Sequence, residues 1–491
     1  MNSKLCIFLF ICLCSVTFSQ EYLDFDPSKD SILHNDDSSF EIVNEQDEEM
    51  ETVYEQDEEM DAKNEFRAAW VDTWNNRALT DAQIQSTLKS LKQYGYNAVV
   101  VQIRRRGDAF YFPKYPNTEP RVTCIPSNLD VLKTMIEYAA PLGIEVHAWM
   151  TTLLVSTKNK PSSAAHVVNA HPEYLTQNYA GEKCISEGYY LDPGNPNALK
   201  WNENVAMDIV KNYDIDGIHF DYIRLPQQDS GYNPTAIARY NKEFGTTGKP
   251  AANNANFRAW RRRQLTDWLR TMYAKIVQVK PAMKVTAATF AGRSDAYDHR
   301  LQDWATWMKQ GLIDANFPMN YTTDSNIYQT RVNDIMANAY NRHVYMGVGA
   351  YLNSNANTIA QFKYARNKNT HGLVLYSYAH NGKTASMSNL QNIYTELFST
   401  PVRTPSMPWK TRGGHIQGQI LDSNNEPVYN AQVKILETNQ TILTDSQGYY
   451  TFLHLPEGEY HIQCLNNEYR SPITPIQVIN TQVSGTDFQI D

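Results

Sequence analysis

Eight short apolar segments alternate with longer amphipathic segments between residues 66 and 398, and this alternation constrains the fold more than any other feature of the sequence. Such alternation indicates βαβ units and a parallel sheet. Eight repeats over about 330 residues predict a (β/α)8 barrel. The predicted strands are residues 67–73, 97–104, 143–150, 217–224, 284–292, 314–321, 343–351 and 372–379. The predicted helices include residues 81–94, 130–140, 198–213, 256–279 and 301–309.

A doubly wound open sheet is the competing α/β architecture. It usually carries a glycine-rich phosphate-binding turn after its first strand. The first predicted strand here runs into "WVDTWNNR", which contains no glycine. The sequence therefore favours the barrel.

The chain before the barrel divides into two segments. Residues 1–20 have one lysine, an apolar run and then small residues, which is the layout of a secretory signal peptide. Residues 21–65 contain 18 Asp and Glu against two lysines and repeat one decapeptide, "EIVNEQDEEM" then "ETVYEQDEEM". Such acidic, apolar-poor sequence predicts a disordered leader. We therefore expect a protein exported to the periplasm, the outer surface or the medium, with lipidation near Cys12 and Cys14 left open.

The chain after the barrel also divides in two. Residues 399–413 are rich in proline and predict a linker. Residues 414–491 contain strand-like runs at roughly ten-residue spacing, which is typical of a small β-sandwich. No run after the signal peptide reaches about 18 apolar residues, so no transmembrane span is expected. Of the cysteines beyond residue 20, Cys124 and Cys184 could form a bridge, which the sequence does not decide.

The segment "DIDGIHFDYIRLP", residues 214–226, places charged residues inside a predicted strand. Side chains of a barrel strand point alternately to the interior and to the helices, and active sites lie where the strands end. Gly217, His219 and Asp221 share the inward face, which puts Asp221 at the mouth. Asp214 and Asp216 precede the strand at its other end and are interpreted as structural.

The same alternation places further inward residues on the other strands. They are Trp70, Asp72, Gln102, Arg104, His147, Trp149, Asn320, Tyr345, Gly347, Gly349, Tyr376 and Tyr378. Inward polar groups at one end of a barrel indicate a ligand site. The predicted substrate-binding residues are Arg104, Asp108, His147, Trp149, His219, Tyr222, Arg224, Asn320, Tyr321, Tyr345 and Tyr376.

Aromatic rings combined with carboxylates suit a sugar substrate. Glycoside cleavage uses two carboxyl groups, one protonated and one ionised. Asp221 is the first candidate, and Asp72 and Asp192 are the predicted catalytic partners, with Asp108 and Asp295 on loops as further alternatives. His147, His219 and Arg104 are candidates to tune the pKa of these carboxyl groups. Glu145 is inward but low in its strand, so we interpret it as structural.

Other chemistries have weaker support. No phosphate-binding glycine loop or metal-spaced set of His and Asp occurs, so no cofactor and no metal are expected. Residues 66–491 hold 41 Lys and Arg against 35 Asp and Glu, spread along the chain. The "RRR" runs at 104–106 and 261–263 are short, and the second is interpreted as a solvated helix face. The sequence therefore predicts no nucleic-acid partner.

Several motifs together resemble one family. "FRAAWVDT", "NAVVVQIRRRGDAFY", "GIEVHAWM", "YLDPGNP" and "DGIHFDYIRLP" are similar to the glycosyl-hydrolase-like 10 family of bacterial barrel proteins, from about residue 66 to residue 397. The resemblance implies a glycosidase acting on peptidoglycan glycan strands stripped of peptide stems, with central chemistry at Asp221, at the end of the fourth strand. After "HAW" the chain departs from the family pattern and reads "MTTLLVS". Residues 414–491 resemble the carboxypeptidase-regulatory-like β-sandwich, an accessory module.

Two functions follow from these observations. The first is an exported glycoside hydrolase acting on a cell-wall glycan or a related complex polysaccharide. The alternative is a glycan-binding barrel without turnover, with the β-sandwich as a docking or spacer module. The lack of an obvious second carboxylate motivates the alternative.

Overall fold

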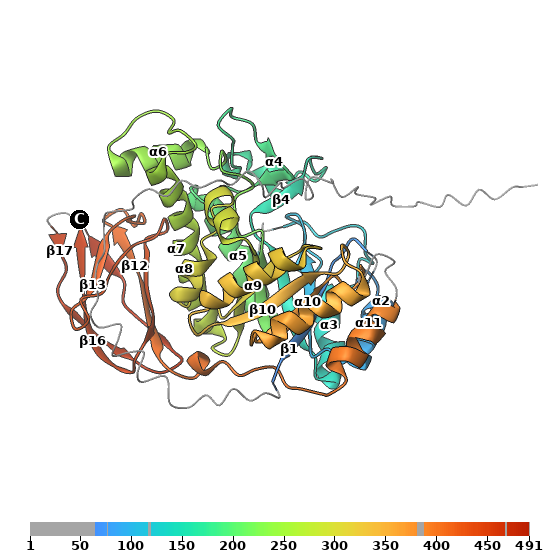
Figure 1. The fold of residues 1–491 in the computed structure, drawn as a ribbon. Coiled ribbons are helices and arrows are strands. Elements are labelled where there is room, and N and C mark those ends of the chain that lie inside the picture. The colour runs from blue at the N-terminus through green and yellow to red at the C-terminus, as the bar shows by residue number, and fades with distance from the viewer. Residues whose placement is uncertain (1–63, 76, 116–118, 381–386, 467–468, 491) are drawn as a thin grey trace, which may run out of the picture. The chain divides into compact units, whose positions relative to one another are not determined.

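The computed structural model describes residues 64–490 except 76, 116–118, 381–386 and 467–468 (Figure 1). The predicted signal peptide and nearly all of the predicted acidic leader lie outside these residues. Among the described helices, none combines the length and apolar character that crossing a membrane requires.

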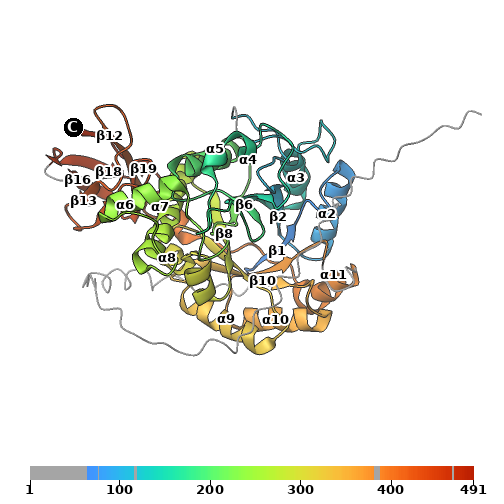
Figure 2. The ribbon, with the colours of Figure 1, turned by 90° about the horizontal axis from the view of Figure 1, so that it is seen from above.

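Eight parallel strands close into a barrel, which confirms the predicted fold class (Figure 2). Sequence order and order around the barrel agree. The strands are β1 (Phe66–Val71), β2 (Ala98–Arg104), β3 (Glu145–Thr151), β7 (Gly217–Asp221), β8 (Lys284–Phe290), β9 (Ala315–Asn320), β10 (His343–Gly349) and β11 (Gly372–Tyr376). Nearly every residue of these strands is buried, as expected when side chains fill the interior and helices cover the outside.

Helices surround the barrel. They are α2 (Asp81–Gln93), α3 (Val131–Ala139), α5 (Pro196–Asn212), α7 (Ala255–Val279), α8 (Trp304–Lys309), α9 (Ser325–Ala337), α10 (Asn355–Asn367) and α11 (Met387–Ile393). The helices α2, α3, α5, α7, α8, α9 and α10 each begin after a polar residue whose side chain accepts a hydrogen bond from a first-turn amide. Such caps define where each helix starts.

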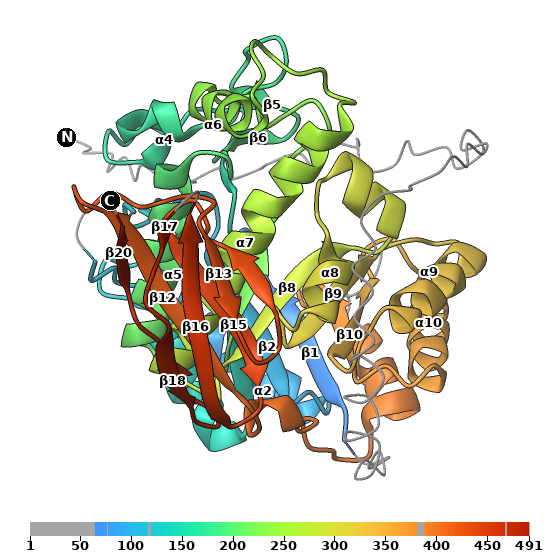
Figure 3. The same ribbon diagram turned by 90° about the vertical axis from the view of Figure 1, so that its left-hand side faces the viewer.

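Two long connections form a layer above the carboxyl ends of the strands (Figure 3). The connection after β3 contains β4 (Leu154–Thr157), α4 (Val167–Ala170), β5 (Cys184–Ile185) and β6 (Gly188–Tyr190). Its three strands form a sheet in the order β4–β6–β5. The connection after β7 contains α6 (Pro234–Phe244). These connections lie at the barrel end where the site is predicted.

The C-terminal region consists of two small sheets, as predicted. One contains β12 (Gly414–Asp422), β15 (Tyr449–Leu455), β19 (Val483–Ser484) and β20 (Phe488–Ile490). The other contains β13 (Gln432–Ile435), β14 (Thr441–Leu443), β16 (Gly458–Asn466), β17 (Tyr469–Arg470) and β18 (Thr474–Val478). Their apolar side chains form a separate core that includes Cys464. None of the three described cysteines, Cys124, Cys184 and Cys464, forms a disulfide bond, so Cys124 and Cys184 are not bridged.

The segment between the barrel and the β-sandwich packs against the amino ends of the barrel strands (Figure 1). Met407 and Trp409 join the aromatic cluster of the barrel interior, and a short 3₁₀ helix covers Pro408–Lys410. The Lys410 ammonium lies 2.8 Å from the carboxylate of Asp314, which directly precedes β9. We call this end of the barrel the closed end.

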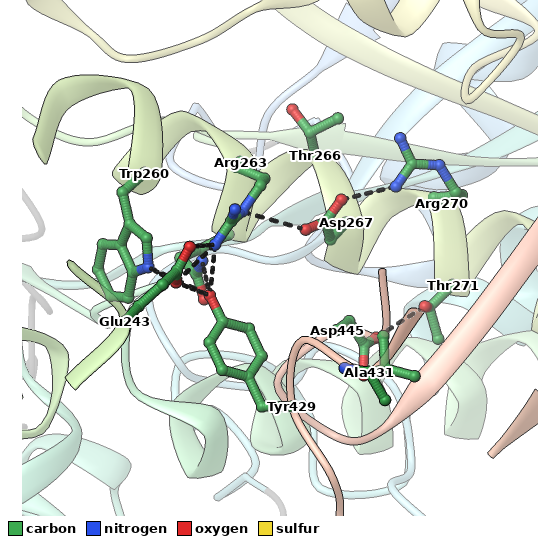
Figure 4. Close-up of polar contacts among 12 residues, drawn as sticks. Glu243, Trp260, Arg263, Thr266, Asp267, Arg270, Thr271, Tyr429, Ala431 and Asp445 are labelled. Carbon is green, nitrogen blue, oxygen red and sulfur yellow. Dashed lines mark hydrogen bonds and ion pairs between the residues drawn. The ribbon is translucent and has the colours of Figure 1, made fainter. Parts of the chain in front are cut away.

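The β-sandwich contacts α6 and α7 through a hydrogen-bonded cluster (Figure 4). The Tyr429 hydroxyl donates to Glu243 (2.8 Å) and accepts from Arg263 (2.6 Å) and the indole of Trp260 (3.1 Å). Thr271 donates to Asp445 over 2.7 Å. Asp445 also accepts hydrogen bonds from the backbone amides of Gln447 and Tyr449 in its own turn.

The interpretation of residues 261–263 as a solvated helix face is wrong. Arg261 and Arg262 are buried. The Arg261 guanidinium donates to the carbonyl oxygens of Gln228 and Ser230, and Arg263 forms an ion pair with Glu243. The arginines bind the connection after β7 and the β-sandwich because these elements cover both sides of α7.

Candidate active site

Asp221 is the last residue of β7 and lies at the open end of the barrel, where it is 5% exposed. The Trp149 indole donates to Oδ2 over 3.0 Å, and the Tyr222 backbone amide donates to Oδ1 over 2.7 Å. Burial raises the pKa of Asp221 to about 6, although Arg224 and these hydrogen bonds oppose that shift. A carboxyl group with this pKa can carry a proton near neutral pH and still release it, as a general acid requires.

The chain turns sharply after Asp221. Tyr222 has φ of 50°, a left-handed conformation uncommon outside glycine. The turn ends the strand three residues earlier than predicted, so the alternation of side chains stops at Asp221 and does not extend to Tyr222. The Arg224 guanidinium lies 4.1 Å from the centre of the Tyr222 ring and 4.8 Å from that of Phe290. Its charge favours the ionised form of Asp221.

Aromatic side chains gather around the open end. Tyr376, at the end of β11, stacks on Tyr321 with ring centres 5.1 Å apart. Each of these two rings also forms T-shaped contacts with Trp70 and with Tyr351. Trp74 meets Trp149 at 6.2 Å. Tyr376, Tyr321 and Trp74 are partly exposed, whereas Trp70 is buried beneath them. Partly exposed rings beside a carboxylate form a surface on which apolar faces of sugar rings can pack.

Three predicted substrate-binding residues point into the barrel, as the alternation requires, but lie in deeper layers. His147 contacts Glu145 (3.2 Å), and Tyr345 stacks on Phe66 at 4.1 Å; both lie toward the closed end. His219 is in the middle layer, between the indole of Trp70 and the hydroxyl of Thr286. All three are fully buried. The alternation gives the direction of these side chains and not their depth, and their role as substrate contacts stays a prediction.

Glu145 forms an ion pair with Lys284 (2.6 Å) and accepts a hydrogen bond from Thr404 of the closing segment. Burial alone would raise its pKa, but His147 and Lys284 lower it to about 2. Asp216 accepts a hydrogen bond from the Val146 amide. Both carboxylates therefore hold the amino ends of strands together, as the structural interpretation expects.

Arg104 and Asn320 were also predicted to contact substrate, but both are fully buried. Arg104 pairs with Glu119 and donates to the carbonyl oxygens of Thr151 and Thr152, so it fixes the end of β3. Asn320 donates to the Tyr328 carbonyl oxygen over 3.1 Å. Asp108 accepts a hydrogen bond from the Arg106 amide and lies 3.7 Å from Arg105. These contacts shape the loops around the site.

The two predicted catalytic partners of Asp221 are engaged elsewhere. Asp72 accepts hydrogen bonds from Asn75 (2.7 Å) and Ser377 (3.1 Å), which joins the ends of β1 and β11. Asp192 accepts from the amides of Gly194 (2.8 Å) and Asn233 (3.1 Å). Burial raises the pKa of both carboxyl groups, and both are about 1% exposed. Their oxygens hold loops in place, which does not fit the role of a substrate-facing base.

Sequence reasoning missed Glu187. It lies in the turn between β5 and β6, above the open end, and its negative charge raises the pKa of Asp221. The signal available in the sequence was its place in the long connection after the third strand, with three residues between it and "LDPGNP". Within the described residues, no group of three or more His, Cys, Asp or Glu is arranged to hold a metal ion.

Comparisons with known proteins agree with this geometry. Residues 65–366 match the model of the family described as Glycosyl hydrolase-like 10, and residues 415–491 match the Carboxypeptidase regulatory-like domain. Glycosyl hydrolase YngK of Bacillus subtilis is 25% identical over 395 residues, which cover 70% of this chain and 74% of that protein. Glycosyl hydrolase DigH of Escherichia coli is 25% identical over 256 residues, and the match spans only 56% of its length and 48% of this chain.

Solved structures show the same fold. The glycoside hydrolase domain of PgaB (BpsB) from Bordetella bronchiseptica superposes with a TM-score of 0.54 at 14% identity, covering 70% of this chain and all of that domain. Alpha-L-fucosidase isoenzyme 2 from Paenibacillus thiaminolyticus superposes with a TM-score of 0.52 at 14% identity, covering 73% of this chain and 52% of the fucosidase chain. At these identities the likeness concerns the fold alone.

Proposed function

The chain belongs to the glycosyl hydrolase-like 10 family, and from this premise we propose that it hydrolyses glycosidic bonds with Asp221 as the general acid. Asp221 gives its proton to the glycosidic oxygen as the bond to the anomeric carbon breaks. The observation that carries the proposal is this buried carboxyl group at the open end of the barrel, with its pKa raised to about 6. A protonated acid next to partly exposed aromatic rings suits protonation of a sugar leaving group.

The proposed substrate is the glycan strand of peptidoglycan after removal of its peptide stems. The family resemblance supports this choice, and the aromatic side chains at the open end support binding of a polymer of pyranose rings. The signal-peptide pattern of residues 1–20 supports export to the compartment that holds this glycan. A related complex polysaccharide is the broader substrate class.

Release of reducing ends from glycan strands denuded by an amidase, compared with intact peptidoglycan, tests the proposal. We expect wild-type protein to cleave the denuded strands and Asp221→Asn to lose about 10³-fold or more in rate, equivalent to about 4 kcal/mol. Asp214→Asn is the matched control, because Asp214 precedes the same strand and its side chain is almost fully exposed. Wild-type rates in Asp221→Asn would contradict the assignment.

A second candidate is a glycan-binding barrel without turnover. The hydrogen bonds of Asp72 and Asp192 to other protein groups support this candidate, because they occupy the carboxylates predicted as catalytic partners. Binding and reducing-end release should both be measured between about pH 4 and 8, a range that spans the Asp221 pKa. Binding of denuded strands without release at any of these pH values would favour this candidate.

A further inference from the structure

The hairpin β5–β6 presents a carboxylate to the open end of the barrel. Ile185 pairs with Gly188, so Ser186 and Glu187 form its two-residue turn. Ser186 has φ of 52°. A left-handed conformation at a residue other than glycine costs free energy and persists where the surrounding structure holds it, often at functional sites. The backbone of the turn that contains Glu187 is therefore held in a defined conformation.

Backbone hydrogen bonds tie this hairpin to the strand that carries Asp221. The Leu153 amide donates to the Tyr222 carbonyl oxygen (3.1 Å), and the Leu153 carbonyl oxygen accepts from the Leu191 amide (2.8 Å). Leu153 thus lies between the end of β7 and the end of β6. These bonds attach the segment that follows β6 to the residue that follows Asp221.

Side chains make the same connection. The Tyr190 hydroxyl donates to Glu187 over 3.0 Å, and the Tyr190 ring lies 6.3 Å from the ring of Tyr222, the residue after Asp221. Tyr190 is fully buried, whereas Glu187 is partly exposed. A buried tyrosine therefore holds a carboxylate that water can reach.

We infer that Glu187 is the general base that acts with Asp221 in glycoside hydrolysis, an inference that rests on the proposed function. Glu187 removes a proton from a water molecule, whose oxygen bonds to the anomeric carbon from the face opposite the leaving group. Asp221 protonates the departing oxygen. One water is added across the bond, and the proton gained by Glu187 returns to Asp221 through solvent. A water between acid and base is the arrangement of inverting glycosidases.

The charges around the pair suit this division of roles. Burial keeps Asp221 protonated to a higher pH, and the negative charge of Glu187 acts in the same direction. An ionised base beside a protonated acid is the state in which the reaction starts. Asp72 and Asp192 differ from Glu187 in exposure, since both are buried and Glu187 is partly exposed.

The experiment measures reducing-end release from amidase-denuded glycan by wild type, Glu187→Gln and Asp221→Asn. Glu182→Gln is the matched control, because Glu182 is exposed and lies in the same connection after β3. We expect kcat of Glu187→Gln to fall about 10³-fold with KM near the wild-type value, and Glu182→Gln to be unchanged. Sodium formate should restore part of the rate in Glu187→Ala, since a small carboxylate can replace a missing base but not a missing structural contact.

The outcomes separate this inference from the proposed function. Wild-type turnover in Glu187→Gln together with loss in Asp221→Asn overturns the role of Glu187 and leaves the hydrolase intact. Retention of anomeric configuration in the wild-type product also overturns the water-activating role. Absence of cleavage by wild-type protein overturns the proposed function, and this inference with it.

Discussion

Asp221 at the open end of the barrel and Asp314 at the closed end are both buried aspartates, yet their surroundings move their pKa values in opposite directions. At Asp221 burial dominates. At Asp314 burial is outweighed by the ammonium of Lys410 and by hydrogen bonds from Val285, Tyr273 and Trp409, which lower the pKa. A buried cation beside Asp314 keeps that carboxylate ionised, whereas Asp221 accepts two hydrogen bonds from neutral donors and can carry a proton near neutral pH.

Removing the cation at the closed end should produce the largest loss of stability. Lys410→Met leaves the Asp314 carboxylate buried without its ion pair, and breaking a buried pair in this way costs about 3–5 kcal/mol. Urea denaturation monitored by tryptophan fluorescence measures the change. Lys89→Met, at an exposed position of α2, is the control and should stay near wild type. A loss below about 1 kcal/mol would mean that the two ends differ less than their contacts indicate.

Removing the charge of Asp221 at the open end should stabilise the folded protein, which is the opposite of the effect expected at the closed end. Because the pKa of Asp221 is raised from 3.8 to about 6 in the folded protein, its contribution to stability is fully present below about pH 4 and is lost as pH rises through about 6. This linkage amounts to at most about 3 kcal/mol. Asp221→Asn should therefore raise the free energy of unfolding by about 1–2 kcal/mol at pH 7.5, after the loss of about 1 kcal/mol for the Trp149 hydrogen bond.

Denaturation of wild type and Asp221→Asn at several pH values between 4 and 8 measures this difference. The excess in the free energy of unfolding of the variant over wild type should shrink as pH falls, because both proteins are then uncharged at residue 221. Comparing the two proteins cancels the contribution of Asp445, whose pKa is also raised to about 6 by burial. A gain independent of pH would show that the pKa of Asp221 is not the cause.

The contrast between the two ends also shows what the sequence could predict. Strand alternation correctly predicted that the side chains of His147, Trp149 and Tyr345 point into the barrel, because side chains of a strand alternate with a period of two. It could not assign their depth, which depends on the register between neighbouring strands: Trp149 pairs with His219, whereas His147 pairs with Gly217 one layer lower. Of these residues, only Trp149 reaches Asp221.

Long-range packing outside the strands was beyond sequence reasoning. The proline-rich composition of residues 399–413 predicted a linker, yet Met407 and Trp409 pack against the barrel interior. The turn that carries Glu187 depends on the pairing of β4 with β6, which no local pattern specifies. For Asp192, the sequence predicted a carboxylate in a loop at the open end but did not show that it would accept hydrogen bonds from two backbone amides.

The junction between α6, α7 and the β-sandwich allows a test of whether the β-sandwich contributes to stability alone or also to turnover (Figure 4). The expected effect is smaller than those above. Tyr429→Phe removes the hydroxyl that Glu243, Arg263 and Trp260 share. Because Arg263 still pairs with Glu243 directly, we expect a loss of only about 1–2 kcal/mol. Thermal unfolding and reducing-end release, measured on the same preparation, check this. Glu243 and Trp260 lie on the two helices that follow β7, the strand that ends at Asp221. A change in kcat larger than about threefold would therefore show that the β-sandwich helps to shape the open end. An unchanged kcat would show that the β-sandwich contributes to stability alone.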